Sequence, residues 1–312
     1  MNYLALDIGG TALKIAIVNE NGKILISDKY PVNFDNYKTP IIDTVLKETD
    51  KFLADNKIES FKGVAVSATG QIDVNKGEVI GTGGNIKNYE GSKFKEKIEE
   101  KYKVKATVIN DANAAALGEL FLGNGKNSKN IVMITIGTGV GGGIVVNGEI
   151  LNGRLGIGGE LGHFSINNKG KKCTCGNTGC YEQYASMSAL IKRVKEELDI
   201  NDINGKEIFE QINHNEKMKE IVDRWIEDVA CGVVSLVHIF NPDIVLIGGA
   251  VSEQKELFID KLRKLVKERA MKNFAKDLKV EPAKLKNDAG IIGALYYLLK
   301  GENKDELQYG EI

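Results

Sequence analysis

Three of the four cysteines in this 312-residue chain fall within eight residues, in the run Cys173-Thr-Cys175-Gly-Asn-Thr-Gly-Cys180, and His163 lies ten positions upstream. Three thiolates and one imidazole are a ligand set for tetrahedral Zn²⁺. The glycines between Cys175 and Cys180 let the loop fold back, so that three sulfurs can converge on one ion. The sequence therefore predicts a zinc site formed by His163, Cys173, Cys175 and Cys180.

Disulfides are the alternative use of four cysteines, as in a secreted protein. The chain opens on a strand-like run rather than on a basic region followed by a long apolar stretch, so a secretory signal is not expected. A tight cluster near a histidine favours metal, and a reducing cytoplasm is the expected compartment. The fourth cysteine, Cys231, lies in an apolar run and is predicted to be a small buried residue.

Three glycine turns that end apolar runs are candidates for phosphate binding. Glycine lets backbone N–H groups approach a phosphate without a Cβ in the way. Thr11 and Thr138 add hydroxyl donors, Lys14 could add charge, and Asp7 could hold Mg²⁺ through water. One such turn is usually only a turn, but three of them favour a nucleotide site. Their glycines are Gly9 and Gly10, Gly137 and Gly139, and Gly248 and Gly249.

Several acids and amides stand where they could handle a polyol. Asn110-Asp111 ends a strand before an alanine-rich helix, so Asp111 could be a general base for a substrate hydroxyl, a helix N-cap, or both. Glu160 and Glu182 could clamp sugar hydroxyls, or could be solvated surface charges. Glu182 follows the last cysteine by two residues, so a metal would fix its position. Asn85 could contact a polyol or be a simple loop residue.

A unit of strand, glycine loop, strand and hairpin occurs twice, at 3–25 and again at 131–151. This pattern indicates an internal repeat, although glycine turns between apolar strands are common enough for a chance likeness. Strands alternate with helical patterns along the chain, which predicts an α/β protein with mixed sheets in two similar halves. Helices are expected at 40–54, 92–102, 112–122, 182–198, 205–212, 216–240, 253–272 and 289–300, and further strands at 61–67, 104–109 and 243–247.

The bulk composition excludes few classes of protein. Hydrophobic content is 42% and charged content 27%, as in ordinary soluble globular proteins, and the length suggests about two domains. A net charge of −1 gives no electrostatic case for nucleic acid or an anionic membrane as partner. No apolar run approaches the roughly 20 residues that span a bilayer.

Taken in order, the motifs resemble those of the ROK family, which comprises repressors, open reading frames and kinases, and they cover nearly the whole chain. The resemblance implies an α/β actin-like ATPase fold of the hexokinase type, a duplicated ribonuclease H-like plan with two lobes around a cleft. The N-terminal lobe would hold residues 1–112 with about 296–312, and the C-terminal lobe residues 113–295. The motifs are Asp7-Ile-Gly-Gly-Thr11, Asn110-Asp-Ala-Asn113, Ile136-Gly-Thr-Gly139, Glu160-Leu-Gly-His163 and the cysteine motif that ends in Glu182.

The resemblance also implies a kinase that transfers the γ-phosphoryl group of ATP to a sugar, with Mg²⁺ and Zn²⁺ as cofactors, in a homodimer or homotetramer. Asp111 would be the catalytic base and His163 would also ligate zinc. The glycine turns would surround ATP, whereas the role of Lys14 is an electrostatic suggestion from the residues alone. The sugar contacts would be Gly70, Asn85, Asn110, Asp111, Glu160, His163 and Glu182.

Three functions stay open. An ATP:hexose 6-phosphotransferase that acts on a glucose-type hexose is the first expectation, and a kinase of N-acetylmannosamine or another N-acetylhexosamine is the second. Thr69 stands before Gly70 where relatives often carry Pro, in a loop that approaches the sugar, so it bears on the substrate. A non-catalytic sugar sensor is the third. Family repressors carry a winged helix-turn-helix before the kinase-like body, and no such DNA-binding segment is expected before Asp7.

Overall fold

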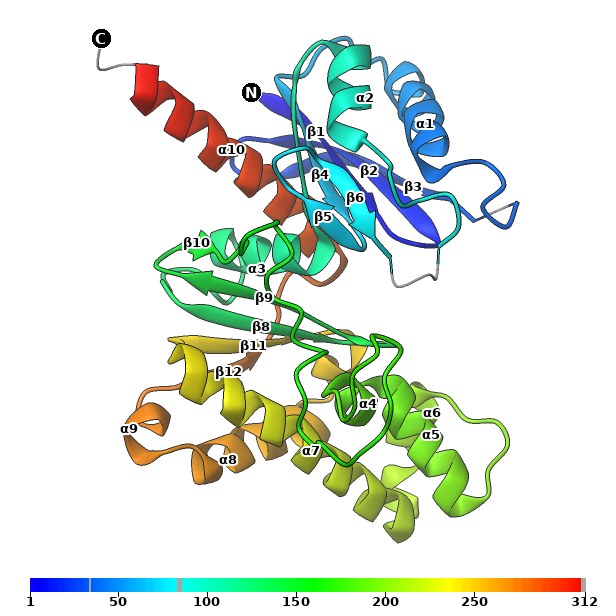
Figure 1. The fold of residues 1–312 in the computed structure, drawn as a ribbon, viewed down its shortest axis with the longest axis vertical. Helices are drawn as coiled ribbons and strands as arrows, with labels where there is room; N and C mark the ends of the chain where they lie inside the picture. The colour runs from blue at the N-terminus through cyan, green and yellow to red at the C-terminus, as the bar shows by residue number, and fades with distance from the viewer. Residues whose placement is uncertain (34, 83–85, 310–312) are drawn as a thin grey trace. The chain divides into compact units, whose positions relative to one another are not determined.

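The computed structural model describes residues 1–33, 35–82 and 86–309, with side chains through Glu302, so the predicted sugar contact Asn85 lies outside the described residues. The chain forms two compact units. The first contains residues 1–126, 150–158 and the segment from 287 onward, and the second contains residues 127–149 and 159–286. Each unit has its own five-stranded sheet and its own apolar core (Figure 1).

The sheet of the first unit has the strand order β3-β2-β1-β4-β7, in which β1 pairs antiparallel with β2 and parallel with β4. Central strands β1 and β4 are apolar on both faces because helices cover both sides, α1 and α2 on one and α3 and α10 on the other (Figure 1). A two-stranded ribbon, β5 and β6, completes the unit. The bounds are β1 (Asn2–Ile8), β2 (Ala12–Asn19), β3 (Ile24–Pro31), β4 (Gly63–Ala68), β5 (Gln71–Asp73), β6 (Glu78–Gly81), β7 (Lys105–Asn110), α1 (Ile41–Asp55), α2 (Phe94–Tyr102), α3 (Asp111–Phe121) and α10 (Ala289–Tyr309).

The sheet of the second unit repeats this plan in the order β10-β9-β8-β11-β12, with the same antiparallel and parallel pairings about its central strand. The predicted internal repeat and the α/β class with mixed sheets are therefore confirmed. Helix α7 carries one apolar side into the core, where Trp225 stacks on Phe258 at 5.1 Å between ring centroids. The bounds are β8 (Ile131–Ile136), β9 (Val140–Val146), β10 (Glu149–Ile150), β11 (Ile244–Gly248), β12 (Lys279–Pro282), α4 (Glu182–Ala185), α5 (Met187–Leu198), α6 (Gly205–Gln211), α7 (Glu216–Phe240), α8 (Asp260–Arg269) and α9 (Lys272–Ala275), with 3₁₀ turns at 212–214, 250–253 and 286–288 and a π turn at 255–259.

Two predicted helices are divided in the structure. The helix expected at 182–198 breaks at Ser186, whose backbone is extended and whose hydroxyl caps α5 by accepting from the N–H of Ala189 at 3.1 Å. The helix expected at 253–272 consists of short turns followed by α8 and α9. Hydrophobic periodicity continues across both breaks, so it could not reveal them.

Helix α10 packs along α3 within the first unit. A Cβ on Gly118 would lie 2.5 Å from the backbone oxygen of Ala289, and a Cβ on Gly293 would overlap the backbone oxygen of Ala114. The glycines thus let the two backbones touch. Because of this packing, the compact unit keeps α3 whole, whereas the predicted lobes divide at residue 112. The functional roles assigned to those lobes stay a prediction.

The prediction that Cys231 is buried is wrong. Cys231 is exposed on α7, together with Glu227 and Arg224, which precede it by about one and two helical turns. Its neighbours Ala230 and Val233 face the core. The surrounding run is apolar in sequence, but a helix turns about 100° per residue, so one member of the run faces outward.

None of the helices within the described ranges combines the length and the apolar character that crossing a bilayer requires.

Candidate active site and metal centre

Polar residues gather where three neighbouring strands of the first unit end. The parallel register pairs Ile8 with Ala68 and Ala68 with Asn110, so β1, β4 and β7 finish side by side. Asp7 and Asp111 therefore lie at one edge of the sheet, where open α/β sheets bind their ligands. The predicted catalytic base, Asp111, and the carboxylate predicted to hold Mg²⁺, Asp7, therefore lie close to each other in this unit.

Asn110, rather than Asp111, is the N-cap of α3. Its Oδ1 accepts from the N–H groups of Ala112 at 3.0 Å and Asn113 at 3.1 Å, and its Nδ2 donates to the Gly70 oxygen at 2.9 Å and to Asp111 Oδ1 at 3.0 Å. These four bonds use both donors and both acceptor positions of the amide. Asn110 therefore caps α3 and positions Asp111 and the Gly70 loop.

The environment of Asp111 suits a base that works near neutral pH. Burial, reinforced by the negative charge of Asp7, raises the pKa of Asp111 to about 6. Hydrogen bonds from the N–H of Ala112 at 2.8 Å, from the Thr69 hydroxyl and from Asn110 oppose that rise by favouring the carboxylate. A base with a pKa just below working pH is ionised and still takes up a proton readily.

Asp7 is held by a residue that the sequence reasoning missed. The Ser67 hydroxyl, fully buried at the end of β4, donates to Asp7 Oδ1 at 2.6 Å. Burial raises the pKa of Asp7 above its ordinary value. The hydrogen bond from Ser67 and the positive charge of Lys14 act on that pKa in the opposite direction but are smaller than the effect of burial. Lys14 itself forms an ion pair with Asp288 and donates to the Asn287 oxygen at 3.3 Å, so part of the charge suggested for phosphate is already neutralised.

Two hydrogen bonds hold the Gly70 loop in addition to the one from Asn110. The N–H of Thr69 donates to the Ile8 oxygen at 2.9 Å, and the Tyr89 hydroxyl donates to the Thr69 oxygen at 3.2 Å. Gly70 has a φ of 91°, and a Cβ there would lie 2.7 Å from the Gly81 oxygen. Glycine is required at this turn. Ser67 and Thr69 lie at the end of a strand, and this position is the feature of the sequence that could have identified them as site residues.

The four predicted metal ligands converge within the second unit. Their ligand atoms all lie within 4.8 Å of one another, with Cys173 Sγ 3.6 Å from His163 Nδ1 and Cys175 Sγ 3.5 Å from Cys180 Sγ. A regular tetrahedron with Zn–S bonds of about 2.3 Å has edges of about 3.8 Å. These separations are close to those edges and too long for a disulfide, and each thiol is free. The donor set and its spacing fit Zn²⁺.

The protonation of the thiols also favours a cation. Burial acts to raise the pKa of Cys173, but hydrogen bonds from Cys175, His163 and Cys180 outweigh it and lower the pKa to about 7. Burial and the neighbouring thiols raise the pKa of Cys180 to about 12. One thiolate thus suppresses the next, and a divalent ion would remove that repulsion. Gln183, which the sequence reasoning missed, donates to Cys173 Sγ at 3.7 Å.

His163 faces two ways. Its Nδ1 lies toward Cys173, while its Nε2 lies 4.0 Å from Glu160 Oε2. Glu160 is exposed, and its backbone oxygen accepts from the N–H of His163 at 3.1 Å. With one ring nitrogen committed to the cluster, the other can meet a polar ligand beside Glu160.

Two of the predicted phosphate turns lie next to each other at one edge of the second sheet. Strand β11 pairs with β8 so that Gly248 is opposite Thr135, and a Cβ on Gly249 would overlap the backbone oxygen of Ile136. At Gly137, by contrast, no described atom lies within 4 Å of the Cβ position, so a ligand could approach the backbone there. The third turn, at Gly9 and Gly10, belongs to the first unit.

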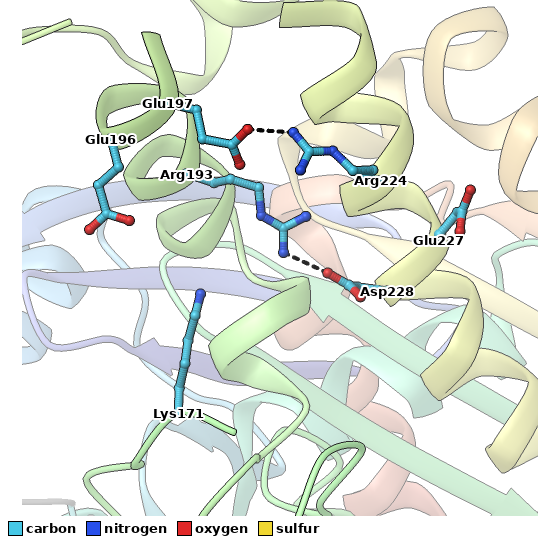
Figure 2. A pocket seen from close by; sticks show the side chains of 7 residues that line it. All are labelled: Lys171, Arg193, Glu196, Glu197, Arg224, Glu227 and Asp228. Atoms are coloured by element: carbon cyan, nitrogen blue, oxygen red, sulfur yellow. Dashed lines mark hydrogen bonds and ion pairs between the residues drawn. The ribbon is translucent and has the colours of Figure 1, made fainter. Parts of the chain in front are cut away.

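A hollow of about 490 Å³ on the second unit is separate from the predicted site. Figure 2 shows its charged side chains, in which Arg193 pairs with Asp228 at 2.6 Å and Arg224 pairs with Glu197 across α5 and α7. Its lining within the described chain shares no residue with the predicted site. The lining residues are Lys171, Arg193, Glu196, Glu197, Arg224, Glu227 and Asp228.

The chain is similar in sequence or in structure to the following proteins over almost its whole length. A glucokinase of Thermotoga maritima is 31% identical over 312 residues, which cover 94% of this chain and 96% of the relative. A solved ROK family glucokinase of Streptomyces griseus, in complex with glucose and AMPPNP, is 28% identical with a TM-score of 0.79 and covers 95% of this chain and 98% of that one. The solved Lmo2764 protein of Listeria monocytogenes, described as a candidate N-acetylmannosamine kinase, is 29% identical with a TM-score of 0.84 and covers 97% of this chain and all of that one.

These likenesses confirm the predicted actin-like ATPase fold. The motifs that suggested it occur in order along the chain, from Asp7 to Glu182. A family model matches from residue 3 to residue 301, and the chain therefore belongs to the ROK family.

Proposed function

We propose that this protein is an ATP-dependent sugar kinase that phosphorylates the 6-hydroxyl of a hexose, with a glucose-type sugar as the first candidate. The observation that carries the proposal is Asp111, a carboxylate at a strand end that is held by three donors and tuned to a pKa of about 6. The Thermotoga maritima relative that is named glucokinase supports the sugar class.

In the proposed reaction, the oxygen of the sugar hydroxyl attacks the γ-phosphorus of ATP. The Asp111 carboxylate takes the proton of that hydroxyl at the same time. The bond from that phosphorus to the bridging oxygen breaks, and ADP leaves. Such transfer depends on alignment and charge neutralisation rather than on covalent chemistry by the protein. Mg²⁺ bound with ATP would neutralise phosphate charge, and Asp7 would hold it through water. The exposed backbone at Gly137 would approach the phosphates.

The second unit contains other candidate sugar contacts. Glu160, His163 and Glu182 stand beside the cluster, which would fix their angles when it holds zinc. Asn110 keeps a place in the proposal as a positioning residue, because the protein itself uses all of its hydrogen-bonding groups. Asn85 stays a prediction.

An N-acetylmannosamine kinase is the second candidate, favoured by the structural likeness to Lmo2764. The test is ADP release with ATP fixed and a panel of glucose, N-acetylmannosamine, N-acetylglucosamine, fructose and a β-glucoside. The proposal expects the highest kcat/KM for glucose. A preference for an N-acyl sugar would replace the first candidate by the second. Sugars that raise the melting temperature without any turnover would show a non-catalytic sensor instead.

Loss of one cysteine of the cluster should weaken both metal and sugar binding. We expect Cys175→Ser to lower zinc content, measured by elemental analysis, and to weaken sugar binding about tenfold by calorimetry, because the side chains beside the cluster lose their anchor. Cys231→Ser is the matched control, since that exposed cysteine lies outside the cluster. Unchanged sugar affinity in a zinc-free Cys175→Ser protein would mean that the cluster only stabilises its loop and does not position the side chains that bind sugar.

A further inference from the structure

Glu182 contacts the glycine turn between β8 and β9. Its Oε2 accepts from the N–H of Val140 at 2.9 Å, and a Cβ on Gly139 would overlap the same oxygen. The half-buried carboxylate therefore occupies the space beside this turn. A sugar contact alone would not require this bond.

Two further contacts hold the same turn. The N–H of Met187 donates to the Gly137 oxygen at 2.9 Å, and Gly162 lies so close to Val140 that a Cβ on Gly162 would overlap the Val140 oxygen. Glu182 in turn donates its own N–H to the Gly162 oxygen at 2.9 Å. Segments 162–163 and 180–182 thus form one layer against the turn.

The same two segments carry metal ligands. Gly162 directly precedes His163, and Glu182 follows Cys180 by two residues. Tyr181, the residue between Cys180 and Glu182, is fully buried: its ring stacks on Phe164 at 5.1 Å between centroids, and its hydroxyl donates to the Val229 oxygen at 2.8 Å. An ion that fixed His163 and Cys180 would therefore restrict Gly162 and Glu182 as well.

We propose that Glu182 is a positioning residue that braces the Gly137–Val140 turn against the Cys/His cluster, so that a loaded cluster strengthens nucleotide binding as well as sugar binding. The proposal rests on the proposed function in one respect, that ATP phosphate binds at this turn. Gly137 and Thr138 are exposed, and ordering such a turn on binding costs conformational entropy. A turn that is already held loses less on binding.

The negative charge of Glu182 opposes phosphate binding at this turn, although its hydrogen bond holds the turn in place. A carboxylate beside a phosphate site repels the ligand, and it also takes the Val140 N–H from the donors available to phosphate. The hydrogen bond and the charge can be separated, because a Gln at this position keeps an oxygen acceptor without the charge, whereas a Leu keeps neither.

The first experiment measures the Kd of MgADP by calorimetry, without sugar, for zinc-loaded and chelator-treated protein. We expect metal removal to weaken MgADP about tenfold in the wild type and in Glu182→Gln, and to change little in Glu182→Leu, which is already weak. Glu160→Leu is the control for loss of an acid near His163, and it should keep the metal dependence. An equal effect of metal removal in Glu182→Leu and the wild type would overturn the brace.

The second experiment reads the turn itself by hydrogen exchange of residues 136–142. Metal removal and Glu182→Leu should each speed exchange at Val140, because both release its N–H. If the wild type binds no MgADP, the proposed function fails, and exchange alone then decides the brace. Identical exchange in loaded and metal-free protein would refute it.

Discussion

Asp111→Asn is expected to lower kcat about 10³-fold while ATP binds as before. The amide can still accept from the N–H of Ala112 and from Asn110, so the start of α3 keeps its hydrogen bonds and only the proton acceptor is lost. Steady-state ADP release measures the first effect, and calorimetry with ATP and Mg²⁺ measures the second. Loss of nucleotide binding in this variant would contradict the assignment of Asp111 as base.

The pKa of Asp111 adds a pH profile to this prediction. Because the carboxylate must be ionised to take a proton, kcat/KM of the wild type should rise with pH up to a plateau, with an acid limb near pH 6. Thr69→Val should move that limb upward, since it removes a hydroxyl that favours the carboxylate, and Thr69→Ser should restore it. A limb that stays in place in Thr69→Val would mean that the hydroxyl does not act on Asp111.

The same pKa predicts that the inactive variant is the more stable protein. A carboxyl whose folded pKa exceeds its unfolded value binds its proton more tightly when folded, so ionising it costs stability as pH rises from about 4 to about 6. Asp111→Asn removes that cost at neutral pH, an effect of about 1–2 kcal/mol because the side chain is only half-buried and water screens part of the interaction. Thermal unfolding at pH 7.5 should show a raised melting temperature, which separates loss of the base from misfolding.

Gly293→Ala is expected to destabilise the protein by about 3 kcal/mol or more. The added methyl would overlap the backbone oxygen of Ala114 and would lie 2.7 Å from the N–H nitrogen of Gly118, and backbone atoms in the middle of a helix cannot move aside cheaply. Helix α10 would have to separate from α3. Thermal unfolding followed by circular dichroism measures the loss.

Gly301→Ala is the matched control in the same helix. No described atom lies within 4 Å of its Cβ position, so only the better helix propensity of alanine remains, and a gain of about 0.5–1 kcal/mol is expected. Equal melting temperatures of Gly293→Ala and the wild type would mean that α3 and α10 pack less closely than the structure shows.

The sequence alone determined the parts of this protein that are written in short contiguous segments. The cysteine spacing around Gly176 and Gly179 predicts the metal cluster, because each ligand is close to the next along the chain. The repeated strand and glycine pattern predicts both sheets and the strand-end position of Asp7 and Asp111, because a buried strand and a tight turn each leave a local signature.

Only the tertiary structure decided which of those residues are already engaged. Glu182 meets Val140 across 42 positions, Lys14 meets Asp288 across 274, and Gly118 meets α10 from the far end of the chain. Such contacts depend on how sheets and helices pack, and no periodicity within one segment encodes them. For the same reason the outward orientation of Cys231 was missed, and Asn110 rather than Asp111 proved to be the N-cap of α3.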